Sequence, residues 1–222
     1  EVATFYHHFD VVTDGQPKPP PLTVRVCDSV KCELFGSEAL ISSLQESLGG
    51  DVRVQRVPCV GRCDEAPVAV VGKNPIPRAT VSQVSDLVQA GSAVMAAQPG
   101  WIRIEEYRRD DGYKAYEACR TGSLTHEHIL EELESSGLRG LGGAGFPAGR
   151  KWRILRDQPA PRLMAVNIDE GEPGTFKDRY YLERDPHRFI EGMLIAAEVI
   201  GIECCYLYVR DEYPSVLQIL GD

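Results

Sequence analysis

Four cysteines in the first third of the 222-residue chain are spaced as two pairs. Four residues separate Cys27 from Cys32, and three separate Cys59 from Cys63. Each pair follows a short run of alternating or β-branched apolar residues, which predicts that both pairs lie in loops after neighbouring strands. Four soft thiolates brought to one centre are typical ligands of an iron–sulfur cluster.

A structural zinc ion is the main alternative for these thiols, because zinc also takes four thiolates. Zinc knuckles usually hold two cysteines two residues apart, so the longer spacers favour the cluster. Unligated thiols are a third interpretation. Seven cysteines and first residues without a signal-peptide pattern argue against a disulfide framework. We expect the other three cysteines to be buried apolar residues or bystander thiols: Cys119, Cys204 and Cys205.

A glycine-rich segment at residues 138–147, Leu-Arg-Gly-Leu-Gly-Gly-Ala-Gly-Phe-Pro, is the second chemical signal. Glycines let backbone N–H groups crowd around a phosphate, and Lys151 can add an ammonium group. Arg150 or a nearby helix N-terminus adds positive potential. The segment contains the G-x-G-x-x-G pattern, but that fingerprint requires a preceding strand, whereas residues 129–135 predict a helix. We expect a phosphate-binding loop outside an ordinary Rossmann site; a merely flexible loop is the alternative.

An acidic segment at residues 167–178 is the third signal. Asn167 and the carboxylates of Asp169, Glu170 and Glu172 crowd into six residues. Such groups can exchange hydrogen bonds with the polar edge of a flavin ring. A solvated acidic loop or a metal site is the competing interpretation.

These groups need an α/β scaffold, which the periodicity of the chain predicts. Thr80 and Gln83 form a capping-box pattern before an apolar helical face, and Gly49 follows a helix with leucines at every fourth position. The strands are expected at residues 22–27, 52–57, 68–71, 163–166 and 206–209. The helices are expected at the end of 1–9 and at 40–48, 80–88, 113–120, 125–135, 186–200 and 214–220.

Charge and hydropathy exclude two classes of partner. The formal net charge is −9, and no basic stretch interleaved with aromatic residues offsets it, so nucleic-acid binding is not expected. The longest apolar run, residues 193–202, is interrupted by Glu198 and is shorter than the roughly 20 residues of a membrane span. We expect a cytoplasmic protein without a membrane span. The five histidines are expected to be surface or capping residues.

The first cysteine region resembles a known family. Residues 26–32 and the stretch Pro-Cys-Val-Gly-Arg-Cys at 58–63 are similar to the thioredoxin-fold [2Fe–2S] ferredoxins, which include the 24-kDa-type subunit of respiratory complex I. Residues 1–6 resemble the helix that precedes that domain. The resemblance covers about residues 1–90 and implies that Cys27, Cys32, Cys59 and Cys63 are the cluster ligands.

The glycine-rich and acidic segments together resemble the FMN- and NADH-binding 51-kDa-type subunit of complex I, over about residues 115–222. By this resemblance the FMN phosphate and ribityl chain are held by Gly140, Gly142, Gly143 and Lys151, with Arg139 and Ala144 in the same cofactor-binding loop. The flavin ring is lined by Asn167, Asp169 and Glu170. The dinucleotide is faced by Phe146 and Glu172. Departures from the family pattern stand at Leu141, Gly171 and Ile154, and the last puts adenine stacking in doubt.

The resemblance implies four segments: the end of a helix and a loop (1–21), a thioredoxin-like [2Fe–2S] domain (22–90), a linker (91–112) and an incomplete FMN- and NAD(H)-binding domain (113–222). The family's paired glutamates and the cysteines for a [4Fe–4S] cluster lie in a later segment that this sequence lacks. Position 1 is not Met, so we expect the numbering to start inside a longer protein.

The fusion of both domains, with all four cysteines kept, points to one branch of the family. Residues 161–167, 185–189 and 210–214 look closest to the beta subunit of molybdenum- or tungsten-dependent, NAD-linked formate dehydrogenase. A partner subunit would then oxidise formate, and FMN would pass the electrons to NAD⁺ with no side chain as acid or base. The diaphorase subunit of an NAD-reducing hydrogenase or of an NADH:quinone oxidoreductase is the alternative. A ferredoxin-like carrier without NAD(H) chemistry also stays open.

Overall fold

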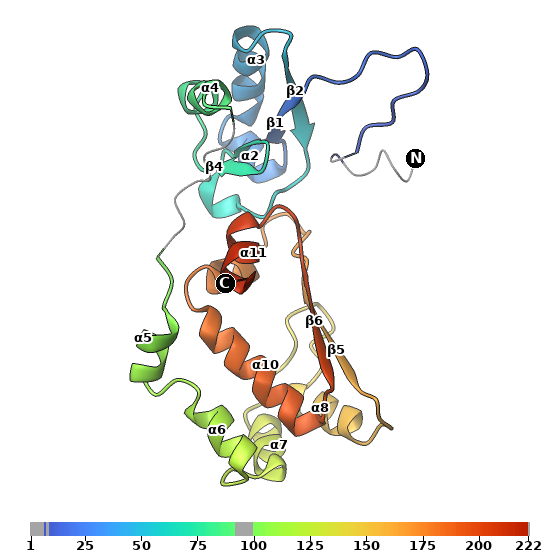
Figure 1. Ribbon diagram of the computed structural model, residues 1–222, viewed down its shortest axis with the longest axis vertical. Coiled ribbons are helices and arrows are strands. Elements are labelled where there is room, and N and C mark those ends of the chain that lie inside the picture. The colour runs from blue at the N-terminus through green and yellow to red at the C-terminus, as the bar shows by residue number, and fades with distance from the viewer. Residues whose placement is uncertain (1–6, 8, 92–99, 222) are drawn as a thin grey trace. The chain divides into compact units, whose positions relative to one another are not determined.

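The computed structural model describes residues 7, 9–91 and 100–221, which divide into two compact units (Figure 1). The first unit comprises Glu1–Gln98, Glu170–Arg179 and Arg210–Leu217. The second comprises Pro99–Asp169, Tyr180–Val209 and Gln218–Asp222. Residues 1–6 and 8 of the expected N-terminal helix and residues 92–99 of the expected linker lie outside the described residues. Residues 170–179 and 210–217 of the expected flavin domain thus pack in the same unit as the cysteine region.

The first unit is built on a four-stranded mixed sheet of order β2-β1-β3-β4. Strands β1 and β2 are parallel, and the other two pairings are antiparallel. The bounds are β1 (Leu22–Cys27), β2 (Val52–Val57), β3 (Ala69–Val71) and β4 (Asn74–Ile76). The first three strands were predicted, β1 from alternating apolar residues and β2 and β3 from valine-rich runs. β4 was not, because three residues centred on a proline carry no period.

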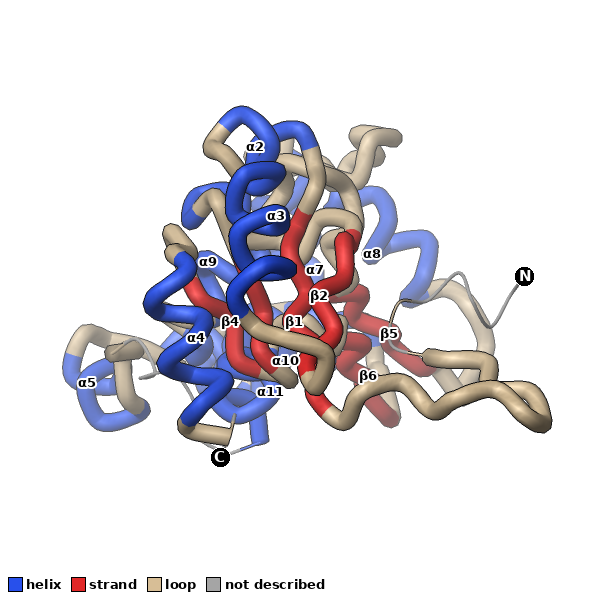
Figure 2. Tube along the Cα trace, turned by 90° about the horizontal axis from the view of Figure 1, so that it is seen from above, coloured by secondary structure: helices blue, strands red, loops and turns tan. Residues whose placement is uncertain are grey.

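Two helices cover one face of this sheet (Figure 2). They are α3 (Ser37–Ser47) and α4 (Val81–Gln89). The predicted capping box is confirmed: Gln83 N donates to Thr80 Oγ1 at 3.3 Å, and Thr80 N donates to Gln83 Oε1 at 3.0 Å. Both helices turn their apolar stripes to the sheet, which buries the main core of the unit: Val24, Val26, Leu40, Ile41, Leu44, Ala69, Val71, Ile76, Ala79 and Val84.

The second unit has two parallel strands in full register, β5 (Leu163–Ile168) and β6 (Cys204–Val209). Its helices are α5 (Ile104–Arg109), α6 (Lys114–Thr121), α7 (His126–Ser135), α8 (Ala148–Arg156) and α10 (Pro186–Ile200). Two more helices have residues in both units, α9 (Lys177–Leu182) and α11 (Pro214–Gly221). The expected linker range 91–112 contains α5, which its short polar sequence did not predict. Within residues 7, 9–91 and 100–221, none of the helices combines the length and the apolar sequence that a membrane span requires.

The core of the second unit lies where α6, α7, α8 and α10 meet, around Cys119, Leu130 and Val199. Cys119 is buried, as expected. Cys204 is exposed and Cys205 is half-buried, so of the two expected roles these cysteines fit that of bystander thiols rather than that of buried apolar residues. Both residues lie at the start of β6, and most side chains of this strand are exposed. The apolar sequence of β6 therefore does not indicate burial here.

A buried carboxylate fixes the start of α6. Glu191 on α10 is 8% exposed and accepts hydrogen bonds from Tyr107 Oη at 2.5 Å, Tyr113 N at 3.0 Å and Tyr116 N at 3.2 Å. Two of these donors are N–H groups at the N-terminus of a helix, which a carboxylate satisfies well. Burial, followed by the hydrogen bond to Glu191, raises the pKa of Tyr107 well above its usual value. This contact joins α5, α6 and α10.

The close packing of α7 on α8 gives a test of the second unit. A Cβ at Gly149 would lie 2.7 Å from Glu134 N, so Gly149→Ala should lower the free energy of unfolding by about 1–3 kcal/mol through overpacking. Gly192, inside α10, has no atom within 4 Å of a built Cβ. The matched control Gly192→Ala should raise stability by about 0.5–1 kcal/mol, because alanine favours helix. Urea unfolding followed by circular dichroism measures both; equal effects would contradict the packing.

Candidate functional site

The four predicted thiols lie at one end of the parallel pair β1 and β2. Cys27 ends β1 and is in register with Val57, the last residue of β2. Parallel strands end at the same edge of a sheet, so the two following loops meet there. Cys32 lies in the short helix α2 (Val30–Leu34), and Cys63 opens the 3₁₀ turn η1 (Cys63–Glu65). All four thiols are buried.

The thiols contact one another as a single group. The Sγ atoms of Cys59 and Cys63 are 3.4 Å apart. The Cys27 thiol is hydrogen-bonded to both Cys32 and Cys59, which joins the two pairs. Among the described residues, no three histidine, cysteine or acidic side chains meet in the arrangement of a site for one metal ion. The contacts between the thiols show that the four predicted cysteines lie together. Their role as ligands stays a prediction.

Each of the four sulfurs also accepts a backbone N–H group. Such donors stabilise negative charge on sulfur and are one of the means by which a protein sets the potential of an iron–sulfur cluster. The donors are Ser29 to Cys27, Val68 to Cys32, Gly61 to Cys59 at 3.4 Å and Gly174 to Cys63 at 3.3 Å.

The pKa values of these thiols indicate that the group needs a compensating cation when it is ionised. The hydrogen bond to Cys27 and then burial raise the pKa of Cys59 strongly, and burial raises the pKa of Cys63. The hydrogen bond from Cys27 lowers the pKa of Cys32, since one thiolate is best shared within the group. Four buried thiolates together need a compensating cation, because burial penalises charge. A soft donor set of this kind fits iron–sulfur ligation.

The predicted acidic segment is organised around Glu170, which is 4% exposed. Its carboxylate accepts from Asp178 N at 2.9 Å, Lys177 Nζ at 3.1 Å and Arg179 N at 3.3 Å. Tyr213 Oη also donates to it, at 3.3 Å. Burial opposes ionisation, but these donors hold the pKa of Glu170 below its usual value. Glu170 therefore stabilises its own segment, and a direct contact with a flavin stays a prediction.

The predicted phosphate loop lies between α7 and α8 in the second unit. Its two ends are paired, with Gly140 N donating to Phe146 O at 3.0 Å and Ala148 N donating to Leu138 O at 2.8 Å. Gly143 has a φ of +96°, which L side chains rarely adopt. A helix and not a strand precedes the loop, as expected, so the G-x-G-x-x-G pattern is not part of a strand–turn–helix dinucleotide site.

The loop leads directly into the start of α8. Lys151 is exposed in the first turn of this nine-residue helix, where the helix dipole favours an anion. Arg139 is exposed, and its guanidinium donates to Gly145 O at 2.9 Å, which closes the loop. The other predicted residues of the loop are all exposed: Gly140, Gly142, Gly143, Ala144 and Phe146. This arrangement can hold a phosphate.

The remaining predicted residues end β5 or follow it along the chain. Asn167 and Asp169 are exposed and belong to the second unit, and Asn167 Oδ1 accepts from Asp169 N at 2.9 Å. Glu172 is exposed and belongs to the first unit. Its carbonyl accepts from Thr175 N at 3.1 Å, which shapes a turn. None of these three side chains is buried.

Sequence reasoning missed three residues beside the thiol group. Arg179 and Arg210 donate to carbonyls of the Cys59–Cys63 loop. Tyr213 is fully buried, and a Cβ at Gly61 would lie 2.2 Å from its Oη. Neither their type nor their spacing marked them, because they approach the cysteines from more than about 110 residues away along the chain.

Comparisons with known proteins match two separate parts of the chain to two families. Residues 1–92 match the family described as thioredoxin-like [2Fe–2S] ferredoxin, and residues 133–222 match the Nuo51 FMN-binding domain. The chain is 46% identical to an NADH-quinone oxidoreductase subunit of Aquifex aeolicus, over 57% of this chain and 29% of that protein. It is 30% identical to the NAD-reducing hydrogenase HoxS subunit alpha of Cupriavidus necator, over 96% of this chain and 40% of that protein.

A solved structure covers nearly the whole chain. The crystal structure of an NAD⁺-reducing [NiFe]-hydrogenase in the air-oxidized state matches 99% of this chain and 41% of its own with a TM-score of 0.77 and 30% identity. The chain thus spans well under half the length of these relatives. The matches support a [2Fe–2S] cluster, FMN and NAD(H) as its cofactors. In this chain a thioredoxin-like [2Fe–2S] ferredoxin domain is fused to a Nuo51 FMN-binding domain.

Proposed function

We propose that the chain is the diaphorase module of a multi-subunit oxidoreductase and transfers electrons between iron–sulfur clusters, FMN and NAD(H). The observation that carries this proposal is the buried group of four thiols, each with its own backbone N–H donor. When bound, FMN supplies two-electron exchange with nicotinamide and one-electron exchange with iron–sulfur clusters.

The proposed roles of the chain's residues are binding and orientation. The four cysteines hold the cluster. Arg139, the glycines and Ala144 of the loop, and Lys151, bind the FMN phosphate and ribityl chain. Asn167, Asp169 and Glu170 line the flavin, and Phe146 and Glu172 face the dinucleotide. No side chain is proposed as a general acid or base. The domain limits 22–90 and 113–222 are part of this proposal, with residues 170–179 and 210–217 reaching into the first unit.

We propose a molybdenum- or tungsten-containing formate dehydrogenase subunit as the electron donor, in the cytoplasm. Support comes from the resemblance of residues 161–167, 185–189 and 210–214 to the beta subunit of that enzyme. The fusion of the two domains with all four cysteines retained also favours this branch. A reducing compartment suits seven cysteines with no disulfide among the described residues.

A second candidate is the diaphorase subunit of an NAD-reducing hydrogenase. It is favoured by the extent of one match, since the HoxS subunit alpha aligns over 96% of this chain, whereas the Aquifex aeolicus relative aligns over 57%. The two candidates differ only in the partner that supplies electrons. The assay is NAD⁺ reduction by the full-length protein purified with its native partners. Activity with formate alone supports the first candidate, and activity with hydrogen alone supports the second.

The ligand proposal predicts the effect of losing one thiolate. Cys63→Ser should remove the cluster's electron paramagnetic resonance signal or change it strongly, with loss of iron, because serine is a poor ligand for this soft site. The control Cys204→Ser changes an exposed cysteine outside the thiol group and should leave iron content and signal unchanged. An unaltered spectrum in Cys63→Ser would contradict the ligand role.

The phosphate-loop proposal predicts weaker flavin binding in Lys151→Ala. Loss of a charge-assisted hydrogen bond to phosphate costs about 1.5–3 kcal/mol, or roughly 10–150-fold in the dissociation constant. Lys114→Ala is the matched control, since Lys114 is exposed in the same unit and pairs with Asp111. Quenching of FMN fluorescence by apoprotein measures both. Equal affinities for the two variants would place the phosphate elsewhere.

A further inference from the structure

Two arginines far along the chain, the buried Arg179 and the half-buried Arg210, hold the loop that carries Cys59 and Cys63. Arg179 is 1% exposed, and its Nε donates to Gly61 O at 3.1 Å. The same guanidinium forms an ion pair with Asp64, the residue after Cys63. The Arg179 side chain therefore binds the loop at two points, at Gly61 in its middle and at Asp64 just after its end.

The second arginine, Arg210, binds the start of the loop. Arg210 Nη2 donates to Cys59 O at 2.9 Å, and its Nε donates to Glu212 Oε2 at 3.1 Å. The remaining guanidinium nitrogen, Nη1, donates to Glu170 O. Arg210 therefore joins a cysteine's own carbonyl to the acidic segment. Its planar, rigid fork suits this task better than a flexible ammonium would.

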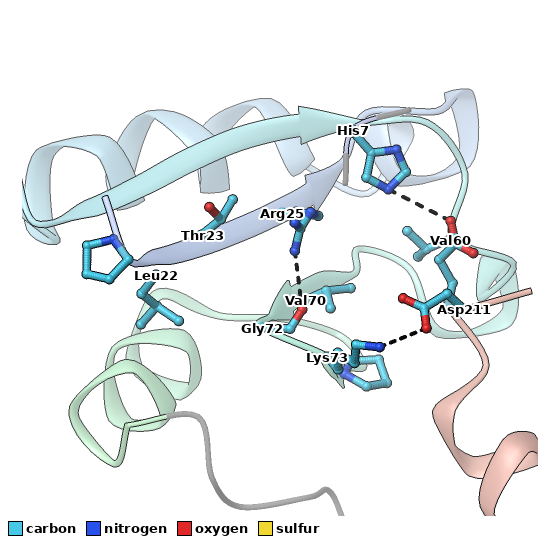
Figure 3. Close-up of a pocket in the computed structure, with 12 residues that line it drawn as sticks. His7, Leu22, Thr23, Arg25, Val60, Val70, Gly72, Lys73 and Asp211 are labelled. Atoms are coloured by element: carbon cyan, nitrogen blue, oxygen red, sulfur yellow. Dashed lines mark hydrogen bonds and ion pairs between the residues drawn. The ribbon is translucent and has the colours of Figure 1, made fainter. Parts of the chain in front are cut away.

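The segments that supply these arginines are themselves anchored in the first unit. Glu170 accepts N–H groups at the start of α9 and so fixes Arg179. Figure 3 shows Lys73, between β3 and β4, directed toward Asp211. Lys73 Nζ and Asp211 Oδ1 are 2.9 Å apart. Tyr213 is fully buried against Gly61, whose φ of +68° and lack of Cβ permit the contact. These contacts anchor both segments, the one that carries Arg179 and the one that carries Arg210.

We propose that Arg179 and Arg210 are positioning residues for the [2Fe–2S] cluster, so that residues 170–179 and 210–217 complete a site whose ligands all lie before residue 64. Their hydrogen bonds hold the Cys59–Cys63 loop in its ligating conformation. This inference rests on the proposed ligand role of those cysteines.

Charge gives the arginines a second effect. Asp64 lies next to a ligand, and the Arg179 guanidinium compensates its carboxylate. Without that guanidinium, the uncompensated negative charge would oppose the arrival of an electron at the cluster. Arg179 therefore keeps the reduction potential of the cluster higher than the cysteines and Asp64 alone would set it.

The test is made on the full chain, with three variants and two readouts that do not require enzyme activity. Arg179→Gln should shift the potential to more negative values in a redox titration followed by electron paramagnetic resonance. It should also speed iron loss to a chelator about tenfold, because buried hydrogen bonds are lost. Arg179→Lys keeps the charge but not the fork, so iron loss should accelerate with a smaller shift of potential. Arg210→Gln should accelerate iron loss.

Arg53→Gln is the charge-matched control, since Arg53 lies on β2 and pairs with Asp10 rather than with the cysteine loop. It should leave both readouts at their wild-type values. Circular dichroism of each variant shows whether it folds, and Arg179→Lys carries the test if Arg179→Gln does not. Wild-type potential and iron retention in folded Arg179 and Arg210 variants would overturn the positioning role. A wild-type chain without a cluster would instead refute the ligand proposal.

Discussion

The structure of the first unit depends on the cost of bringing four thiols together away from water. A buried thiolate is unfavourable by itself, and the pKa values of Cys59 and Cys63 are raised accordingly. Parallel strands β1 and β2 bring the four side chains to one edge of the sheet, and a backbone N–H group meets each sulfur. Such a group is stable as thiolates only with a cationic centre, which is the role that a [2Fe–2S] cluster fills.

The contacts that surround the buried thiols also explain why the acidic segment and the segment 210–217 belong to the first unit. Gly174 supplies the N–H group for Cys63, and Arg179 and Arg210 hold the carbonyls of the loop. Glu170 stabilises this arrangement through a carboxylate that is itself almost fully buried. A segment predicted for its likeness to a flavin-binding loop is therefore also part of the surroundings of the thiols. Residues 170–179 and 210–217 lie within the Nuo51 match by sequence, but they belong to the first unit by their contacts.

Much of this could be predicted from sequence because the signals are local. Alternating or valine-rich apolar runs predicted β1, β2 and β3, and the pair Thr80 and Gln83 predicted the start of α4. Cysteine spacing predicted which thiols meet. Short elements such as α2 and β4 carry too few residues to show a period. The roles of Arg179, Arg210 and Tyr213 could not be predicted, because a buried arginine and an exposed one look alike in sequence. Their contacts depend on tertiary packing between segments far apart along the chain.

The most direct test of the central claim is the metal and sulfide content of the chain purified without oxygen. The four-thiol group as a [2Fe–2S] site predicts about two irons and about two acid-labile sulfides per chain, with a paramagnetic signal after reduction by dithionite. One zinc ion per chain, with no iron, no sulfide and no signal, would contradict it. The thiol group would then be a structural metal site, and the chain would lack the one-electron centre that the proposed function requires.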